Sequence, residues 1–305
     1  MAHALELPGS NPILSGHSKL TVKKGDYLYT VETKGDASTY TVTDGKQTVT
    51  LPIQWSFGKH SQTWVFQRDG DWYEGLVSYY ATLDGLDTTI GDGALTPRTV
   101  DEAVGRKLLK NEIRDCFGCH SSDSVHQGNL TLETLKPGVT CEHCHIGANG
   151  HLLDVLQGDY GSTPPRLSKL STESISSFCG QCHRTWETVV RNRWRGPIDV
   201  RFQPYRLANS KCFDGTDPRI SCLACHDPHQ DVVRQDTGYD SKCLACHAAA
   251  PKQVASQSSR DAKVCPVAKS KCVTCHMPKI PLPGGHAKFT DHQIRVVKEG
   301  ESFPD

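Results

Sequence analysis

Six copies of one five-residue pattern, Cys-x-x-Cys-His, hold the residues of this chain that are best suited to chemistry. Two thiols spaced by two residues can add to the two vinyl groups on one edge of a haem, and the histidine that follows can bind the iron. Random shuffling of the same composition gives about 0.03 such patterns per chain. Tetrahedral zinc sites are the alternative, but zinc does not require a histidine after every second cysteine. The pattern therefore predicts six covalently bound haem c groups.

Each of these pentads supplies two cysteines for thioether bonds and one proximal histidine for iron. The attachment cysteines are Cys116, Cys119, Cys141, Cys144, Cys179, Cys182, Cys222, Cys225, Cys243, Cys246, Cys272 and Cys275. The proximal histidines are His120, His145, His183, His226, His247 and His276. The pentads follow one another at irregular intervals, which excludes a tandem repeat. They also lie too close together for each haem to have its own folded pocket, so neighbouring haems are expected to share walls.

The six irons also need ligands on their second axial side. Met277 is the only internal methionine, so histidine must supply nearly all of them, and bis-histidine ligation gives lower potentials than His/Met ligation. The predicted distal ligands are His151, His229, His286 and His292, with two more expected among His17, His60 and His126. We expect His229 to bind a different haem from His226, because three residues are too few to reach the opposite face. His3 is discounted as close to the terminus, and His143 because it lies between two anchoring cysteines.

Two cysteines, Cys212 and Cys265, lie outside the pentads. In an oxidising compartment two such thiols predict a disulfide, and closing a loop of roughly 50 residues would add about 4 kcal/mol to stability. The alternative is two buried free thiols.

Composition and charge limit the partners and the location. The chain carries 34 basic and 34 acidic residues, which argues against a nucleic-acid partner. An arginine-rich stretch, residues 184–206, could pair with haem propionates or form a solvated helix face. No apolar run is long enough to span a bilayer, and the first four residues do not resemble a signal peptide, so any such peptide is expected to have been removed. Because haem attachment of this kind takes place outside the cytoplasmic membrane, we expect a periplasmic, cell-surface or extracellular protein.

The patterning predicts an α+β fold with two domains: a small antiparallel β domain, residues 1–95, and a loop-rich hexahaem domain with short helices, residues 96–305. Turn pairs such as Gly35-Asp36, Asp44-Gly45 and Asp69-Gly70 separate the β-like runs. The runs are Leu20–Lys23, Tyr27–Thr33, Thr39–Thr43, Thr48–Trp55, Thr63–Gln67 and Asp71–Tyr80. The hydrophobic share of 36% is low for a large core, so regular secondary structure should be sparse where haem fills the interior.

Three helices are predicted around the pentads. A capping box formed by Thr99 and Glu102 opens the first, which runs through about Ile113. The second spans His151–Gln157, and the third spans about Arg184–Arg195, where apolar residues recur at helical spacing. These apolar stripes are expected to pack on haem or on the core.

Several segments resemble one family of proteins. They are residues 115–120 (DCFGCH), 138–145 (GVTCEHCH), 221–229 (SCLACHDPH), 272–279 (CVTCHMPK) and 289–295 (FTDHQIR), with 57–64 (FGKHSQTW) and 78–80 (SYY) in the β region. These segments are similar to secreted multihaem cytochromes c related to the tetrahaem acceptor of hydroxylamine oxidoreductase. The resemblance covers most of the chain and implies paired haems, bis-histidine iron and distal roles for His151, His229, His286 and His292. This sequence has six predicted haem sites where the tetrahaem proteins have four, so the order of the haems cannot be carried over from them.

The function that these observations favour is electron transfer to redox partner proteins or extracellular acceptors, with no catalytic residue assigned. Multihaem nitrite reductases have a Cys-x-x-Cys-Lys site, and this sequence contains none. One alternative is a redox enzyme in which a five-coordinate haem acts on hydroxylamine or nitrogen oxides. Another is a subunit of an extracellular cytochrome filament, or nanowire, in which the haems continue between protomers.

Overall fold

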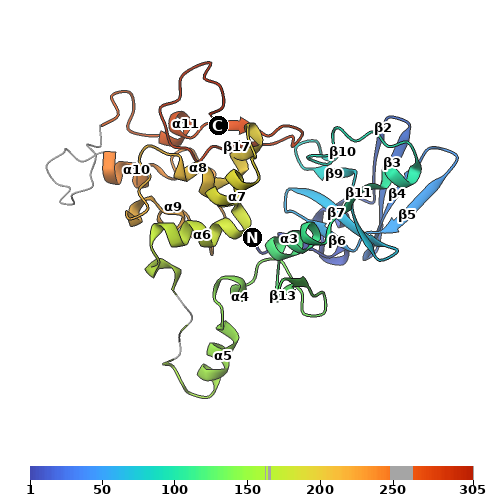
Figure 1. The fold of residues 1–305 in the computed structure, drawn as a ribbon, viewed down its shortest axis with the longest axis horizontal. Helices are drawn as coiled ribbons and strands as arrows, with labels where there is room; N and C mark the ends of the chain where they lie inside the picture. The colour runs from blue at the N-terminus through green and yellow to red at the C-terminus, as the bar shows by residue number, and fades with distance from the viewer. Residues whose placement is uncertain (162, 164–165, 248–263, 305) are drawn as a thin grey trace. The chain divides into compact units, whose positions relative to one another are not determined.

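The computed structural model describes residues 1–161, 163, 166–247 and 264–304, which form a mixed α+β structure (Figure 1). The chain divides into two compact units. Unit 1 comprises residues 1–165 and 283–286, and unit 2 comprises residues 166–282 and 287–305. The sequence placed the boundary after residue 95, whereas in the structure residues 96–165 belong with the β strands. The first two pentads are therefore part of unit 1.

A four-stranded antiparallel meander opens unit 1. Its strands are β2 (Lys19–Lys24), β3 (Tyr27–Lys34), β4 (Ala37–Thr43) and β5 (Thr48–Pro52). Alternate residues point to the core, as period-2 patterning requires: Tyr29 and Tyr40 are fully buried. The predicted turn at Gly35 is confirmed, with Lys34 paired to Ala37 and a φ of 60° at Gly35 that suits glycine.

A second antiparallel sheet contains seven strands. They are β1 (Leu5–Glu6), β6 (Trp55–Phe57), β7 (Ser61–Arg68), β8 (Asp71–Gly75), β9 (Val77–Tyr80), β10 (Gly85–Thr88) and β11 (Gly105–Leu108). The predicted run 48–55 divides here, because β5 pairs with β4 whereas β6 pairs with β7. The predicted run 71–80 also divides, into β8 and β9, and each of these pairs with a different part of β7.

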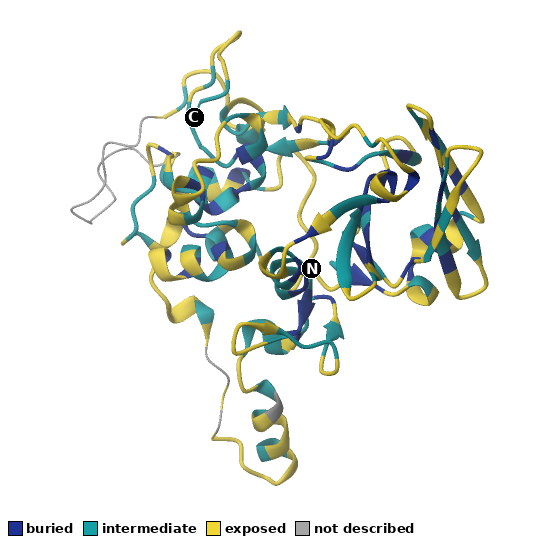
Figure 2. Cartoon of the chain, turned by 45° about the vertical axis from the view of Figure 1, so that its right-hand side comes forward, coloured by how far each residue is buried: buried dark blue, intermediate teal, exposed yellow. Residues whose placement is uncertain are grey.

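Both faces of this second sheet are buried. On β7, Trp64 and Phe66 join the cluster that contains Tyr29 and Tyr40, and the rings of Tyr40 and Phe66 lie 4.7 Å apart. Val65 points the other way, into a second cluster with Leu5, Phe57 and Phe117. The buried residues of unit 1 gather along these strands (Figure 2). The sheet thus packs on the meander through one face and on a helix through the other.

The predicted helix from Thr99 to Ile113 is wrong in its length. Its start is confirmed, since Thr99 Oγ1 accepts a hydrogen bond from the Glu102 amide at 3.2 Å, but α2 covers only Val100–Val104. At Gly105 φ is 152°, and a Cβ there would lie 1.9 Å from the Glu74 carbonyl oxygen. The chain therefore enters β11, beside β8, and a new helix, α3 (Lys110–His120), begins after Leu109.

The remainder of unit 1 consists of short elements. They are the 3-10 helix η1 (Pro8–Ser10), α1 (Pro12–Gly16), β12 (Ser121–Ser122), β13 (Val125–His126), β14 (Asn129–Leu130), β15 (Lys136–Pro137), α4 (Cys141–Cys144) and α5 (Ala148–Leu156). Helix α5 corresponds to the predicted helix 151–157. Its leucines Leu152, Leu153 and Leu156 are exposed, although the sequence suggested that they pack (Figure 2).

Unit 2 is built from short helices and loops. Its elements are the 3-10 helices η2 (Leu167–Lys169), η3 (Pro197–Arg201) and η4 (Pro218–Ile220), the helices α6 (Thr172–His183), α7 (Trp186–Arg191), α8 (Gln203–Ala208), α9 (Cys222–Cys225), α10 (Asp240–His247) and α11 (Cys272–His276), and the antiparallel pair β16 (Lys279–Pro281) and β17 (Lys288–Thr290). Helix α7 is shorter than the predicted helix 184–195, because Arg184 and Arg193 both have positive φ.

Few apolar side chains are buried in the described part of unit 2. They are Ile175, Val189, Val200, Phe202 and Leu282. Both large hydrophobic clusters consist of unit 1 residues. Large apolar side chains of unit 2, including Trp186 and Trp194, remain at least a third exposed. The short helices agree with the sequence-based expectation for this part of the chain, but regular secondary structure there is not sparse.

One buried carboxyl group of unit 1 makes its stability depend on pH. Burial, with the nearby charge of Glu74, raises the pKa of Asp92 to about 6. Its Oδ2 has no hydrogen-bond partner among the described residues, and Arg106 Nε lies 3.6 Å from its Oδ1. An unfolded aspartate titrates near pH 4, so the folded chain keeps this proton to a higher pH. Ionising Asp92 should therefore cost stability increasingly between about pH 4 and pH 6.

We predict that Asp92→Asn removes this cost and raises the free energy of unfolding at pH 7 by about 2 kcal/mol. Little change is expected at pH 4, where the folded carboxyl is neutral and the unfolded one is only about half ionised. Urea titrations at the two pH values, followed by circular dichroism, measure the difference. Asp26→Asn, at an exposed position, is the control. An equal effect of Asp92→Asn at both pH values would contradict the prediction.

Candidate functional site

All six pentads form a turn of helix. The paired cysteines lie within α3, α4, α6, α9, α10 and α11 (Figure 1). The proximal histidine is the last residue of α3, α6, α10 and α11, and the next residue after α4 and α9. Residues three apart on a helix share a face, with Cβ atoms about 5–6 Å apart. Each pair of thiols therefore faces one way, as two bonds to one porphyrin edge require, and the histidine follows within the same turn.

Hydrogen bonds orient four of the six proximal histidines through Nδ1. His120 Nδ1 lies 2.8 Å from the Ala4 carbonyl oxygen, and His276 Nδ1 lies 2.9 Å from that of Arg295. When Nδ1 donates to a carbonyl oxygen, the lone pair is on Nε2, which is the tautomer that binds a metal through Nε2. This arrangement is the second observation, after the helical turns, that fits the residues to haem.

The other two oriented histidines are in unit 2. His183 Nδ1 lies 3.2 Å from Gln203 Oε1, and His226 Nδ1 lies 3.3 Å from the Tyr239 hydroxyl. The Tyr239 ring also meets the His226 ring edge-on at 5.3 Å. The two remaining predicted proximal histidines differ in exposure: His145 is half-buried after α4, and His247 is exposed at the end of α10.

The first pentad is held by the β sheet. Phe117, which lies between Cys116 and Cys119 on α3, is fully buried. Its ring meets those of Trp55, Phe57 and Trp72 at 5.3, 5.1 and 5.6 Å, all close to edge-on. Such aromatic pairs add about 0.5–1.5 kcal/mol each beyond the area that they bury. The β strands therefore fix the orientation of this pentad.

Pentads of unit 2 touch one another in pairs. Helix α6 packs on α9, and the Cys179 and Cys222 thiols share a hydrogen bond, which together with burial raises the pKa of Cys179. Helix α10 packs on α11 in the same way, and burial is the main cause that raises the pKa of Cys272 to about 12, with Cys243 beside it. Haems attached at these thiols would start from neighbouring points of the chain.

Asp240 ties the fifth pentad to the sixth. This aspartate is the first residue of α10, and its carboxylate accepts hydrogen bonds from the amides of Lys271 at 2.7 Å and Cys272 at 2.9 Å. These amides lie at the start of α11, where a helix has donors without partners of its own. The two bonds lower the pKa of Asp240, with the Cys272 amide as the largest cause. Asp240 therefore caps one pentad helix from another.

Of the predicted distal ligands, His292 has the arrangement that best suits iron. Its Nδ1 lies 3.0 Å from the Thr290 carbonyl oxygen, and its ring centre lies 6.1 Å from that of His226, with 38° between the planes. Burial is the main cause that lowers the pKa of His292 to about 4, so this imidazole is neutral near pH 7. A neutral imidazole is the form that binds a metal.

Three other predicted distal ligands lie on α5 and in two loops. His151 is half-buried on α5, and its Nδ1 is buried without a hydrogen-bond partner among the described residues. His229 is exposed, with Nδ1 3.1 Å from Asp227 Oδ1. His60 is exposed in the bend between β6 and β7. Their roles stay predictions.

The structure engages both ring nitrogens of His17. Nδ1 lies 2.7 Å from the Ile13 carbonyl oxygen and Nε2 lies 3.0 Å from Asp84 Oδ1. The predicted distal role of His17 therefore does not agree with its placement. The sequence could not show this, because Asp84 is brought to His17 by the packing of distant segments.

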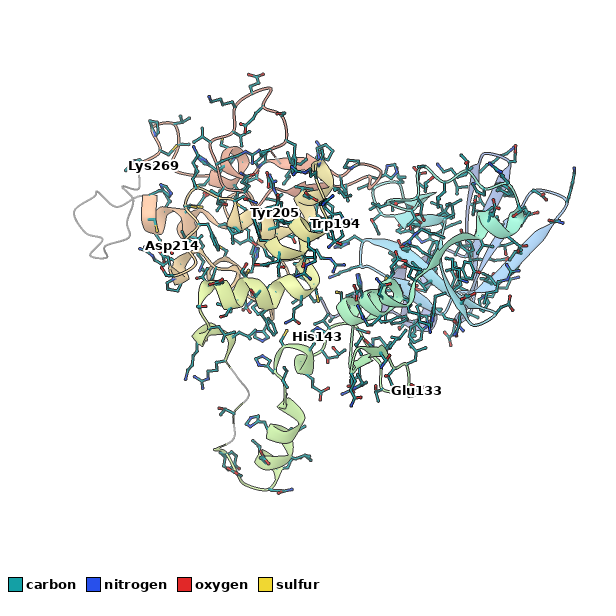
Figure 3. The ribbon with its side chains drawn as sticks, viewed as in Figure 1. Glu133, His143, Trp194, Tyr205, Asp214 and Lys269 are labelled. Carbon is teal, nitrogen blue, oxygen red and sulfur yellow. The ribbon has the colours of Figure 1, made fainter. Side chains whose placement is uncertain are left out.

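His286 and His126 are also engaged through Nε2. His286 Nε2 lies 2.7 Å from Asp87 Oδ2, and its ring meets Tyr80 at 4.8 Å, so the loop 283–286 belongs to unit 1. His126 Nε2 lies 2.8 Å from Thr134 Oγ1 in an exposed hairpin. Neither placement presents Nε2 to an iron, in contrast to the expectation. His143, on α4 (Figure 3), has a pKa lowered by burial.

The predicted disulfide is not formed in the structure. Both Cys212 and Cys265 are free thiols. Burial raises the pKa of Cys212, which lies near Cys243 and Cys246. Cys265 instead accepts hydrogen bonds from the amides of the following turn, which lower its pKa.

One functional residue that sequence reasoning missed is Arg206. It was grouped with an arginine-rich stretch expected to meet propionates or solvent, but it is 1% exposed and pairs with Asp291, the neighbour of His292. Nε donates to Asp291 Oδ1 at 2.9 Å and one terminal nitrogen to Oδ2 at 3.0 Å. Spacing alone gives no signal for such a pair, because the two residues are far apart in the sequence.

In the described part of the chain, no three His, Cys, Asp or Glu side chains gather in a group that could hold a metal ion. A haem iron takes only one or two ligands from the protein, so this finding concerns other metal sites. No helix among the described residues has the length and apolar character needed to cross a membrane. No protein-family model, curated protein or solved structure matches the chain.

We predict that Asp240→Ala impairs the sixth pentad. Two amides at the start of α11 lose their acceptor, which should cost about 1–2 kcal/mol. The intact mass of the purified protein should then show a larger fraction that lacks one haem. Asp44→Ala removes an exposed carboxylate that also accepts two amide hydrogen bonds, from Lys46 and Gln47 in a turn of unit 1, and is the control. An unchanged mass distribution and an unchanged melting temperature in Asp240→Ala would contradict this role.

Proposed function

We propose that this chain is a hexahaem c-type cytochrome that transfers electrons outside the cytoplasm. The observation that carries the proposal is the shape of the pentads: all six form a helical turn with both thiols on one face and a histidine directly after them. The Nδ1 hydrogen bonds of three predicted proximal histidines to carbonyl or amide oxygens support it, since they favour the tautomer that binds iron through Nε2.

The chain's own residues would hold and orient the haems. The cysteines of each pentad would form the thioether bonds, the histidine would take one axial position, and carbonyl or hydroxyl partners would fix the ring. Bound haem iron would supply reversible one-electron chemistry. The exposed apolar side chains beside pentads, such as Leu152 and Leu153 after the second and Trp186 after the third, offer surface for porphyrin to cover.

The paired pentads of unit 2 support a relay. Thiols of the third and fourth pentads are in contact, and so are those of the fifth and sixth. Electrons pass readily only between closely spaced cofactors, and the polypeptide sets that spacing. The proposed partners are redox proteins or extracellular electron acceptors, as in the secreted multihaem cytochromes that the pentad segments resemble. Assembly into a filament stays a prediction.

A redox enzyme is the second candidate function, and the placement of three predicted distal histidines favours it. His17, His126 and His286 have Nε2 engaged by other groups. If they stay so engaged, four of the seven predicted distal histidines remain for six irons, and at least one haem would keep an open coordination position. Such a haem could bind hydroxylamine or a nitrogen oxide.

The test of the proposal is the haem count. We expect intact mass spectrometry to show six haems that survive acid-acetone extraction, and dithionite to give the absorption bands of reduced c-type haem. Cys179→Ala with Cys182→Ala should remove one haem, whereas Cys212→Ala, outside the pentads, should remove none. A colourless polypeptide with free thiols after extraction would refute covalent attachment.

Electron paramagnetic resonance separates the carrier from the enzyme. The carrier should show low-spin ferric signals that account for all six haems. A high-spin ferric signal that changes when nitric oxide is added would favour the enzyme.

A further inference from the structure

We propose that His226 and His292 are the two axial ligands of the haem attached at the fourth pentad, and that the buried Arg206–Asp291 ion pair holds His292 in this position. The inference rests on the proposed function, which supplies the haem. It adds a pairing of proximal and distal ligand that the sequence left open.

The separation of the two rings fits one iron between them. An imidazole nitrogen binds a transition metal at about 2 Å, so two rings on opposite sides of a metal have centres roughly 6 Å apart. The observed distance is 6.1 Å between the ring centres of His226 and His292.

The hydrogen bonds of both rings agree with this role. His292 Nδ1 donates to the Thr290 carbonyl oxygen, and His226 Nδ1 contacts the Tyr239 hydroxyl. In both rings Nδ1 has its own partner, so Nε2 is the nitrogen suited to a metal. His226 follows the fourth pair of cysteines directly, which makes it the proximal ligand there. His229 cannot reach the opposite face of the same haem, so that face needs a ligand from another segment.

The segment that carries His292 is fixed by a buried ion pair. Arg206, on α8, holds both carboxylate oxygens of Asp291, and the two side chains are 1% and 0% exposed. Arg206 also donates to Gln293 Oε1 at 2.7 Å, so it contacts the residues on both sides of His292. Arg295 forms a second ion pair with Asp291, in which its terminal nitrogen donates to Oδ2 at 2.7 Å.

Two other contacts hold the backbone of the same segment. Ser210 Oγ donates to the His292 carbonyl oxygen at 3.1 Å and lies 2.8 Å from the amide nitrogen of Ile294. On the far side of Arg206, its guanidinium donates to the Pro304 carbonyl oxygen and lies 4.3 Å from the centre of the Phe303 ring. Arg206 is therefore a positioning residue, because it acts on His292 through the backbone and not by direct contact.

The first experiment removes the distal ligand. In His292→Ala, low-spin haem should fall by one of six, with a new high-spin ferric signal, while intact mass still shows six haems. Added imidazole should restore the low-spin signal. His17→Ala is the control, since that ring is hydrogen-bonded through both nitrogens, and it should change nothing. A low-spin spectrum of His292→Ala identical to that of the native protein would overturn the inference.

The pairing itself is tested by combining variants. His226→Ala and His292→Ala should each affect one haem, and the double variant should affect that same single haem. Loss of low-spin signal from two haems in the double variant would show that the residues serve different irons. Failure of the proposed function is distinguishable, because the native protein would then lack the mass of six haems.

The positioning role is tested with Arg206→Gln and with the nearly isosteric Asp291→Asn. Each should give a mixture of high-spin and low-spin signal from one haem, with the haem count unchanged and imidazole restoring the low-spin form. Arg219→Gln breaks an exposed bidentate pair with Asp217 in the same unit and is the matched control. A fully low-spin spectrum in Asp291→Asn, the variant that best preserves packing, would overturn this part.

Discussion

The three-residue spacing of two thiols on a helical turn is the constraint on which this structure depends. It puts both sulfurs of each pentad on one face and brings the histidine into the same turn, six times over in a chain with few other repeated features. Under the proposed function, everything else in unit 2 serves to support these turns. Asp240 caps one pentad helix from another, and α6 and α9 bring two pairs of thiols together.

The two units satisfy the need for a core in different ways. Unit 1 buries tyrosines, tryptophan and phenylalanine between its sheets and closes its second sheet with α3. The described part of unit 2 has few buried apolar side chains, and it contains a buried ion pair between Arg206 and Asp291. A buried ion pair contributes little net stability compared with apolar packing, but it strongly restricts geometry. Such restriction is what a ligand-bearing segment requires.

The sequence predicted those features that depend on local patterns. Strand alternation around Tyr29 and Tyr40, the turn at Gly35 and the cap at Thr99 all reflect short-range rules, and the structure agrees with them. The sequence-based predictions that disagree with the structure depend on contacts between distant segments. The predicted helix ends before Gly105, a position where β8 leaves no room for a side chain. His17 contacts an aspartate that only the tertiary fold brings near.

The same distinction applies to the candidate site. Cysteine spacing depends on the sequence alone, so the proposed attachment positions could be named from it, and His292 could be named as a candidate ligand. Its partner could not, because the approach of His226 and the burial of Arg206 are consequences of tertiary packing. Counting cysteines also could not show that Cys265 is engaged by its own turn.

The packing of Phe117 against three aromatic rings of the β sheet has a consequence for biogenesis. The leading part of the chain has an apolar interior of its own, so it can become ordered before any cofactor arrives. The first pentad would then lie on a part of the chain that is already folded. The later pentads belong to a segment whose interior, under the proposed function, is completed only as porphyrins are delivered, so maturation of this protein would be directional from its amino-terminal end.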